Sequence, residues 1–131
     1  MTKNMTISEI LSAYEALNNF IKKDIPMPGK LSWIISDNLD ELKKHAEKFQ
    51  QKKEYLGQQF IKSGKTSKND DGTESVASEH MTEYVEKIQE LLLIERELII
   101  EPVSIEEFKK LDSLSVLDIK ALELMVTKEV N

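Results

Sequence analysis

The chain has 131 residues, carries a formal net charge of −6 and contains no cysteine. This length suits one domain with a modest core, and 32% charged with 6% aromatic residues is typical of a soluble, helix-rich protein. The lack of cysteine excludes disulfides, thiol catalysis and thiolate metal sites. No apolar run has the length of a membrane span or a signal peptide, so we expect a cytoplasmic protein without a membrane partner.

Charge is distributed unevenly along the sequence. Residues 1–69 have a net charge of +4, whereas residues 70–131 have a net charge of −10. The overall excess of acid does not favour non-specific binding to nucleic acid.

The first helix is predicted from its start signal. Thr6 can cap the helix and Glu9 can reach back to it, while Met5 and Ile10 can close a hydrophobic staple. We expect this helix to end near Lys23, because two prolines follow. The preceding residues 2–6 could form a short strand.

A long helix is predicted from Lys30 to Lys62. Its apolar residues recur at steps of three and four, which places them on one helix face. An uninterrupted helix of this length extends about 50 Å and needs a partner to pack along. Residues 36–38 are poor interior helix residues and could break it, although we favour continuity. The apolar positions are Leu31, Ile35, Leu39, Leu42, Ala46, Phe49, Leu56 and Phe60.

Residues 63–75 contain no apolar side chain and are predicted to form a mobile loop. Within them, Gly64-Lys65-Thr66 matches the end of a phosphate-binding loop, but the upstream glycine is missing and no strand precedes it. Asp70-Asp71-Gly72 lacks the other ligands of a calcium loop. Both motifs are therefore interpreted as loop or turn.

A second helix is predicted from about Ser75 to Glu95. Folded back antiparallel on the first long helix, its glutamates would lie beside lysines of that helix. Exposed ion pairs of this kind contribute only about 0–1 kcal/mol each, so they would determine how the two helices pair and orient more than they would stabilise the fold. The expected partners are Glu79, Glu83, Glu86 and Glu90 with Lys53, Lys52, Lys48 and Lys44.

The C-terminal part is predicted to hold a strand and two short helices. Leu98-Ile99-Ile100 is a β-branched run whose plausible partner is the segment 2–6. Ser104 and Ser115 are helix caps, with helices expected to reach Leu111 and about Thr127.

The predicted fold class is mainly α. We expect a long antiparallel helical hairpin plus a small helical head, to which the short two-stranded β pairing of residues 2–6 with residues 98–100 could be added. We expect the head to comprise residues 1–45 and 90–131. The hairpin arm, akin to a coiled coil, would comprise residues 46–89.

The titratable residues do not indicate catalysis. His45 lies among lysines, and His80 has only Glu83 at a ligand-like spacing, so both are interpreted as surface histidines and neither a metal site nor a cofactor is expected. Serines that precede a glutamate are already explained as caps. We therefore expect no catalytic residue and no enzyme activity.

Apolar residues that do not fit the inner seam of a two-helix arm predict a partner surface. The candidates are Tyr55, Ile61 and Tyr84 on the arm, together with Trp33 in the head. A second copy of the chain is the simpler partner, since an antiparallel dimer would bring the lysine face of one copy to the glutamate face of the other. A monomer that binds an unidentified protein is the competing interpretation.

The order of parts resembles a family of small proteins encoded by phages of Gram-positive bacteria and their prophages, which carry a domain of unknown function. The residues that carry the resemblance are Tyr14-Glu15-Ala16-Leu17-Asn18, Leu31-Ser32, Asn38-Leu39-x-x-Leu42, Leu91-Leu92, Leu98-Ile99-Ile100 and Leu122-x-x-Met125. The resemblance implies a phage accessory factor acting in the bacterial host cell. It implies no catalytic residue.

The function expected from the sequence is that of a non-enzymatic protein-interaction module. The alternative is a nucleic-acid-associated factor that uses the lysine-rich helix face. We favour the first, because opposing acids and the near absence of arginine argue against nucleic acid.

Overall fold

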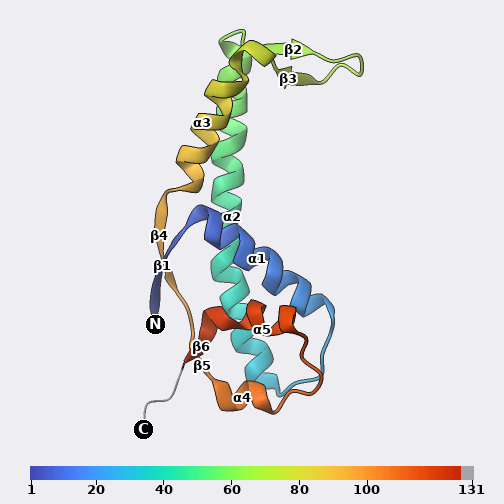
Figure 1. Cartoon of the computed structure of the whole chain (residues 1–131), viewed down its shortest axis with the longest axis vertical. Helices are drawn as coiled ribbons and strands as arrows, with labels where there is room; N and C mark the ends of the chain where they lie inside the picture. Colours follow the sequence, from blue (N-terminus) through green and yellow to red (C-terminus); the bar gives the residue numbers. More distant parts are fainter. Residues whose placement is uncertain (128–131) are drawn as a thin grey trace.

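A computed structural model describes residues 1–127 of the chain (Figure 1). The chain is mainly helical, with one long helix and a few short strands. In chain order the elements are β1 Thr2–Thr6, α1 Ile7–Lys22, α2 Gly29–Lys62, β2 Thr66–Lys68, β3 Glu74–Val76, a 3-10 turn Ser78–His80, α3 Met81–Leu92, β4 Glu95–Ile99, β5 Val103–Ser104, α4 Ile105–Lys109, α5 Val116–Leu122, a 3-10 turn Glu123–Met125 and β6 Val126–Thr127.

Helix α2 runs the length of the molecule without a break (Figure 1). Its predicted continuity is confirmed, and its end is set by Gly64, which has a φ of 71°. The backbone N–H of Gly64 donates to Ile61 O, and that of Lys65 donates to Phe60 O. This is the Schellman pattern, in which a left-handed glycine closes the last helical turn. The Gly64-Lys65-Thr66 motif therefore ends a helix.

Helix α1 begins as predicted. The Thr6 hydroxyl accepts from the backbone N–H of Glu9 at 3.2 Å, and the Glu9 carboxylate accepts from the Thr6 N–H at 2.9 Å. Both bonds hold the first turn together, since those N–H groups have no partner within the helix. In Figure 1, α1 crosses the middle of α2.

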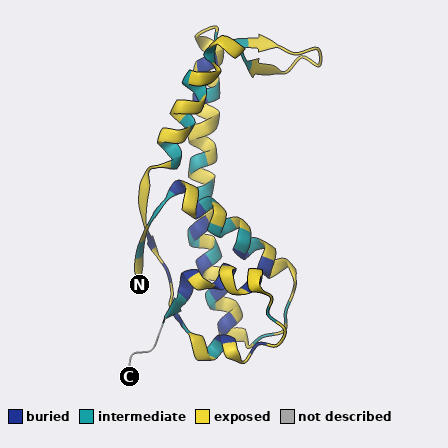
Figure 2. Cartoon of the chain, in the orientation of Figure 1, coloured by how far each residue is buried: buried dark blue, intermediate teal, exposed yellow. Residues whose placement is uncertain are grey.

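The core lies where α1, the N-terminal half of α2, β4 and α5 meet. Buried side chains concentrate in this lower part of the molecule, whereas the upper part is largely exposed (Figure 2). The predicted stripe of α2 faces inward, with half-buried Leu39, Ala46 and Phe49 between buried members. The buried apolar residues of α2 are Leu31, Ile35, Leu42, Leu56 and Phe60.

Strand β4 is held on both of its edges. On one edge it pairs antiparallel with β1, with Thr2 opposite Ile99, so the predicted strand pairing is confirmed. On the other edge the Ile99 N–H donates to the Glu41 carboxylate at 2.7 Å, and the Glu101 N–H donates to the Asn38 side-chain oxygen at 2.8 Å. Alternate N–H groups of a strand point to opposite edges. Two side chains of α2 thus replace a neighbouring strand.

Three segments differ from the prediction. Residues 63–75 are predicted to be a loop but contain β2 and most of β3, and these two strands pair with each other in a hairpin. The second helix is shorter than 75–95, because the preceding residues form β3 and a 3-10 turn and the following ones form β4. The last helix ends at Leu122, and β6 then pairs parallel with β5. In the second and third cases, strand pairing with another segment replaces the predicted helical residues.

The predicted ion pairing between lysines of α2 and glutamates of the second helix is wrong. Among the described residues, no lysine of α2 lies within 4.0 Å of a glutamate of α3, and Glu79, Glu86 and Glu90 are exposed. Lys44 instead pairs with Glu41 of its own helix. Within the part of the chain that the structure describes, α3 makes one ion pair, between Glu83 and Lys65, which follows α2, at 2.8 Å.

Limited trypsin digestion should cut first after Lys68. This residue is exposed in a short strand near the tip of the β2–β3 hairpin, whereas Lys65 holds Glu83 and pairs through its backbone with Phe60 and Ala77. Local opening at an exposed tip costs little free energy. Mass measurement of early fragments checks this, and a first cut within α2 would contradict it.

Candidate functional site

The structure places the predicted partner-binding residues on different surfaces. Trp33 and Tyr55 are 73% and 63% exposed, and Ile61 is also exposed. Tyr84 is half-buried, and its ring meets Phe60 edge-on with a centroid distance of 5.3 Å. Tyr84 is therefore part of the contact between α3 and α2.

Helix geometry keeps the three exposed residues apart. Tyr55 and Ile61 are six residues apart on α2, which separates them by about 120° around the helix. Trp33 lies 22 residues before Tyr55, about 33 Å along the axis. Because α2 is continuous over all three positions, the residues predicted as one site do not form a single patch.

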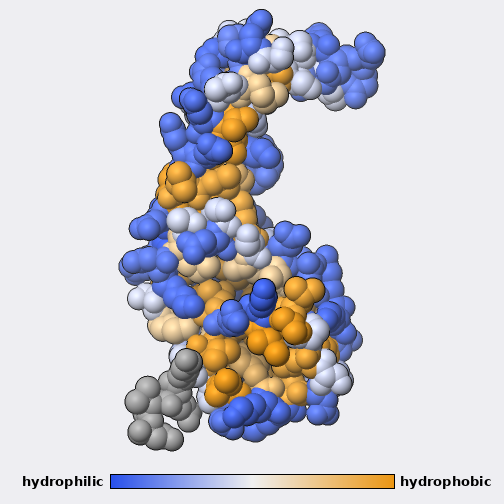
Figure 3. All heavy atoms as spheres, viewed as in Figure 1, coloured by the Kyte–Doolittle hydropathy of each residue, from blue (hydrophilic) through white to orange (hydrophobic). Residues whose placement is uncertain are grey.

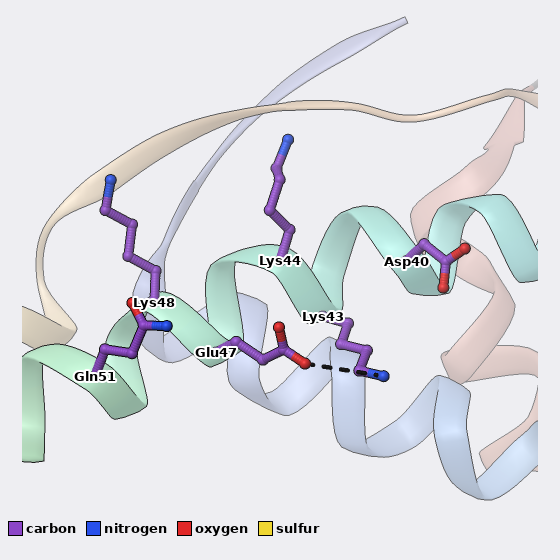
Figure 4. Close-up of a pocket in the computed structure, with 6 residues that line it drawn as sticks. All are labelled: Asp40, Lys43, Lys44, Glu47, Lys48 and Gln51. Carbon is purple, nitrogen blue, oxygen red and sulfur yellow. Dashed lines mark ion pairs between the residues drawn. The ribbon is translucent and has the colours of Figure 1, made fainter.

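The lysine-rich face of α2 is an open surface of mixed charge. A shallow hollow of about 520 Å³ lies there, and its six lining residues all come from α2. Figure 4 shows Lys44 and Lys48 pointing the same way, away from the pair that Lys43 forms with Glu47 at 3.8 Å. The hollow is lined by Asp40, Lys43, Lys44, Glu47, Lys48 and Gln51.

A second candidate surface, which we call the head groove, lies between α4 and α5. It encloses about 460 Å³ and is lined mainly by apolar side chains. On α5, Ile119 lines the groove and is 51% exposed, and Val116, one helical turn before it, is 71% exposed. Leu117 is 76% exposed on the opposite flank of α5, where it lines a hollow against α1. Figure 3 shows hydrophobic residues gathered over this part of the molecule. The groove is lined by Ile105, Phe108, Lys109, Leu111, Leu114, Ile119, Leu122, Glu123 and Val126.

His45, predicted to be a surface residue, is buried with 5% of its surface exposed. Among the described residues no hydrogen-bond partner reaches its Nε2 atom. Burial lowers the pKa of His45, and the nearby cations Lys44, Arg96 and Lys48 lower it further against the opposing effect of Glu41. The imidazole is therefore neutral at pH 7.

Within residues 1–127, no three His, Asp or Glu side chains gather into a group that could hold a metal ion. Nor is any helix of this region long and apolar enough to cross a membrane. No protein-family model matches the chain, and neither a curated protein nor a solved structure is significantly similar to it. Inference about function therefore rests on the surfaces described above.

Sequence reasoning missed two buried polar residues, Asn38 and His45, although a signal for them is present. Together with the apolar positions Ile35, Leu42 and Phe49 they recur at steps of three and four along α2. That spacing puts every member on the inward face regardless of residue type. The head groove had a weaker signal, because it needs the relative placement of two short helices.

Proposed function

We propose that this chain is a non-enzymatic protein-interaction module that binds a protein partner through the head groove and the adjoining outward face of α5. The observation that carries the proposal is the exposure of Ile119, which lines an apolar groove, and of Val116 one helical turn before it. Contiguous exposed apolar surface in a monomer marks an interaction site, because water contact with it is unfavourable.

The form of this surface favours a macromolecule over a small ligand. A small molecule could fill the groove of about 460 Å³, but it would leave the adjoining Val116 uncovered. A partner helix laid along the groove with its apolar face inward would cover both parts. Lys109 and Glu123 line the same groove and can orient a partner through polar contacts.

The arm is the second part of the proposal. In Figure 1, α3 lies beside the distal half of α2, and the contact of Tyr84 with Phe60 supports an antiparallel helical hairpin. Among residues 1–127, no lysine of α2 pairs with a glutamate of α3, and Tyr55 is exposed. These features support a second copy of the chain as a partner at the arm. The resemblance to phage proteins suggests a bacterial host protein as the partner at the head.

One observation also supports the alternative of a nucleic-acid-associated factor. Because α3 does not neutralise the lysines of α2, Lys48, Lys52 and Lys53 remain available to phosphates. The mixed charge of the surrounding face, with Asp40 and Glu47 among the lysines, weighs against it. We therefore rank it second.

Substitution at the head groove tests the proposal. Wild-type protein and the variants Ile119→Glu and Gln58→Glu are used to capture proteins from a bacterial lysate, and each captured protein is then purified and titrated against all three. We expect Ile119→Glu to weaken binding by about tenfold or more, since it places a charge in an apolar contact, while Gln58→Glu on the exposed arm changes little.

Two results would contradict the proposal. One is equal affinity of the Ile119→Glu variant and the wild-type protein for every captured protein. The other is binding of single-stranded or duplex DNA that weakens steeply with salt in the absence of any protein partner, which would favour the alternative. Light scattering on the same samples reports whether the chain associates with itself.

A further inference from the structure

His45 lies at a junction of four elements in the middle of the molecule. It faces inward from the middle of α2, and the start of α1, the end of α3 and the start of β4 meet around it. It does not line the head groove, so its role is separate from the interaction surface proposed there. The residues that gather at this junction are Ile7, His45, Lys48, Phe49, Lys52, Leu91, Ile94 and Arg96.

The junction accommodates a neutral imidazole but not a charged one. His45 is 5% exposed, and its Nε2 atom, with less than 1 Å² of accessible surface, has no hydrogen-bond partner among the described residues. An imidazolium carries a proton on both ring nitrogens, so Nε2 would become a charged donor that neither an acceptor nor water can reach. Burying a donor without a partner costs free energy, and the cost is larger for a charged group.

The charged groups around His45 also oppose a further positive charge. Glu41 is the carboxylate that acts on the imidazole, but it is engaged by Lys44 at 2.6 Å and by the backbone N–H of Ile99 at 2.7 Å. The residues that α1 and α3 contribute to the junction are apolar. Since like charges repel each other, the cations resist protonation of the imidazole while the junction is closed. These cations are Lys44, Lys48 and Lys52 of α2 and Arg96 of β4.

The segment from Leu91 to Arg96, which we call the junction segment, is the weakest cover over His45. Its first two residues are half-buried, and the other four are exposed. Helix α3, which leads into it, has no buried residue, whereas α1 carries the buried residues Ile7 and Ile10 in its first turn. Segments with few buried contacts open at a lower free energy than the core does.

We propose that protonation of His45 opens the junction segment, so that mild acid releases the end of α3 and the start of β4 from α2. In the open form the imidazolium contacts water, which satisfies its N–H groups and screens it from the surrounding cations. Leu91 and Ile94 then leave Phe49, which exposes apolar surface between the head and the arm.

Proton linkage gives the direction of the response. Burial and the nearby cations hold the pKa of His45 in the closed form below that of an exposed histidine, about 6.5, so the open form binds more protons. The open population therefore grows as the pH falls below about 6.5, and for one proton it grows by at most about tenfold per pH unit.

Amide hydrogen exchange at about pH 7.5 and about pH 5.5, on either side of the ordinary histidine pKa, tests the proposal. The backbone N–H of Ile7 donates to Ile94 O at 2.9 Å and that of Ile94 donates to Leu91 O at 3.3 Å, so both amides report on the junction segment. We expect their protection, corrected for the intrinsic effect of pH on exchange, to fall by about tenfold at the lower pH. The variant His45→Leu should lose this pH dependence, and the matched control His80→Leu should keep it.

NMR titration of the unmodified chain keeps the test valid even if His45→Leu fails to fold. We expect the ring of His45 to titrate below about pH 6.5. The proposal is overturned if the ring titrates at or above that value, if the two amides keep their protection at both pH values, or if His45→Leu retains the full pH dependence. Protection of these amides as strong as that of Leu42 in the core would also overturn it, because the junction would then open only when the whole chain unfolds.

Discussion

Replacing Leu42 with alanine is expected to lower the free energy of unfolding by about 2–5 kcal/mol. Leu42 is 0% exposed and lies in the main core, so removing its methyl groups loses apolar burial and leaves a cavity that the surrounding helices only partly fill. Urea unfolding followed by circular dichroism measures the change.

Two further alanine variants serve as controls for Leu42. Leu92 is half-buried, so Leu92→Ala should cost clearly less than Leu42→Ala. Ile99 is 71% exposed, and Ile99→Ala should change stability by less than about 0.5 kcal/mol. A loss below about 1 kcal/mol at Leu42 would show that the core described here is misplaced.

Replacing Asn38 with alanine is expected to cost about 1–3 kcal/mol. The side-chain amide donates to Glu101 O at 2.9 Å and accepts from Glu101 N–H at 2.8 Å, and the residue is 1% exposed. Removing it leaves both backbone groups of Glu101 without their partner and frees the chain that follows β4. The exchange of the Glu101 amide hydrogen should accelerate with the loss of stability.

Asp37→Ala is the matched control for Asn38, since Asp37 is the exposed neighbour on the same helix. It should leave both stability and the Glu101 exchange rate close to wild type. Unchanged exchange at Glu101 in the Asn38→Ala variant would mean that the side chain does not hold this segment.

Local signals in the sequence were sufficient to predict the elements that have clear capping residues or a clear apolar spacing. The capping residues Thr6 and Ser115 each begin a helix in the structure, through reciprocal bonds with Glu9 and Asp118. The apolar spacing located the inward face of α2, and the β-branched run at Leu98 located the strand that pairs with the N-terminus. Each of these features depends on neighbours in sequence or on one simple pairing.

Residue type was a poor guide at positions where tertiary contacts decide whether a side chain is buried. Asn38 was interpreted as a weak point of α2, yet it is buried because Glu101 supplies partners for its amide. His45 was assigned to the surface by its lysine neighbours, although its spacing from Leu42 and Phe49 places it inward. Periodicity was the better guide in both cases, because position on the helix decides which residues face the core.

Charge complementarity was also a poor guide to helix pairing. The predicted contacts between lysines of α2 and glutamates of α3 required a long second helix, but α3 has only 12 residues. Solvated ion pairs contribute too little to impose an arrangement against pairing of β3 with β2 and of β4 with β1. The candidate site on the head could not be predicted, because it forms only when α4 and α5 meet.

Site-specific photo-cross-linking in bacterial cells tests most directly whether the chain is a protein-interaction module. A benzophenone amino acid replaces Ile119 in the head groove or, as a control, Gln58 on the exposed face of α2. We predict that position 119 links to a discrete protein of different mass, identified by mass spectrometry, and that position 58 does not. No product at position 119 beyond that at position 58, or a product with nucleic acid alone, would contradict the account.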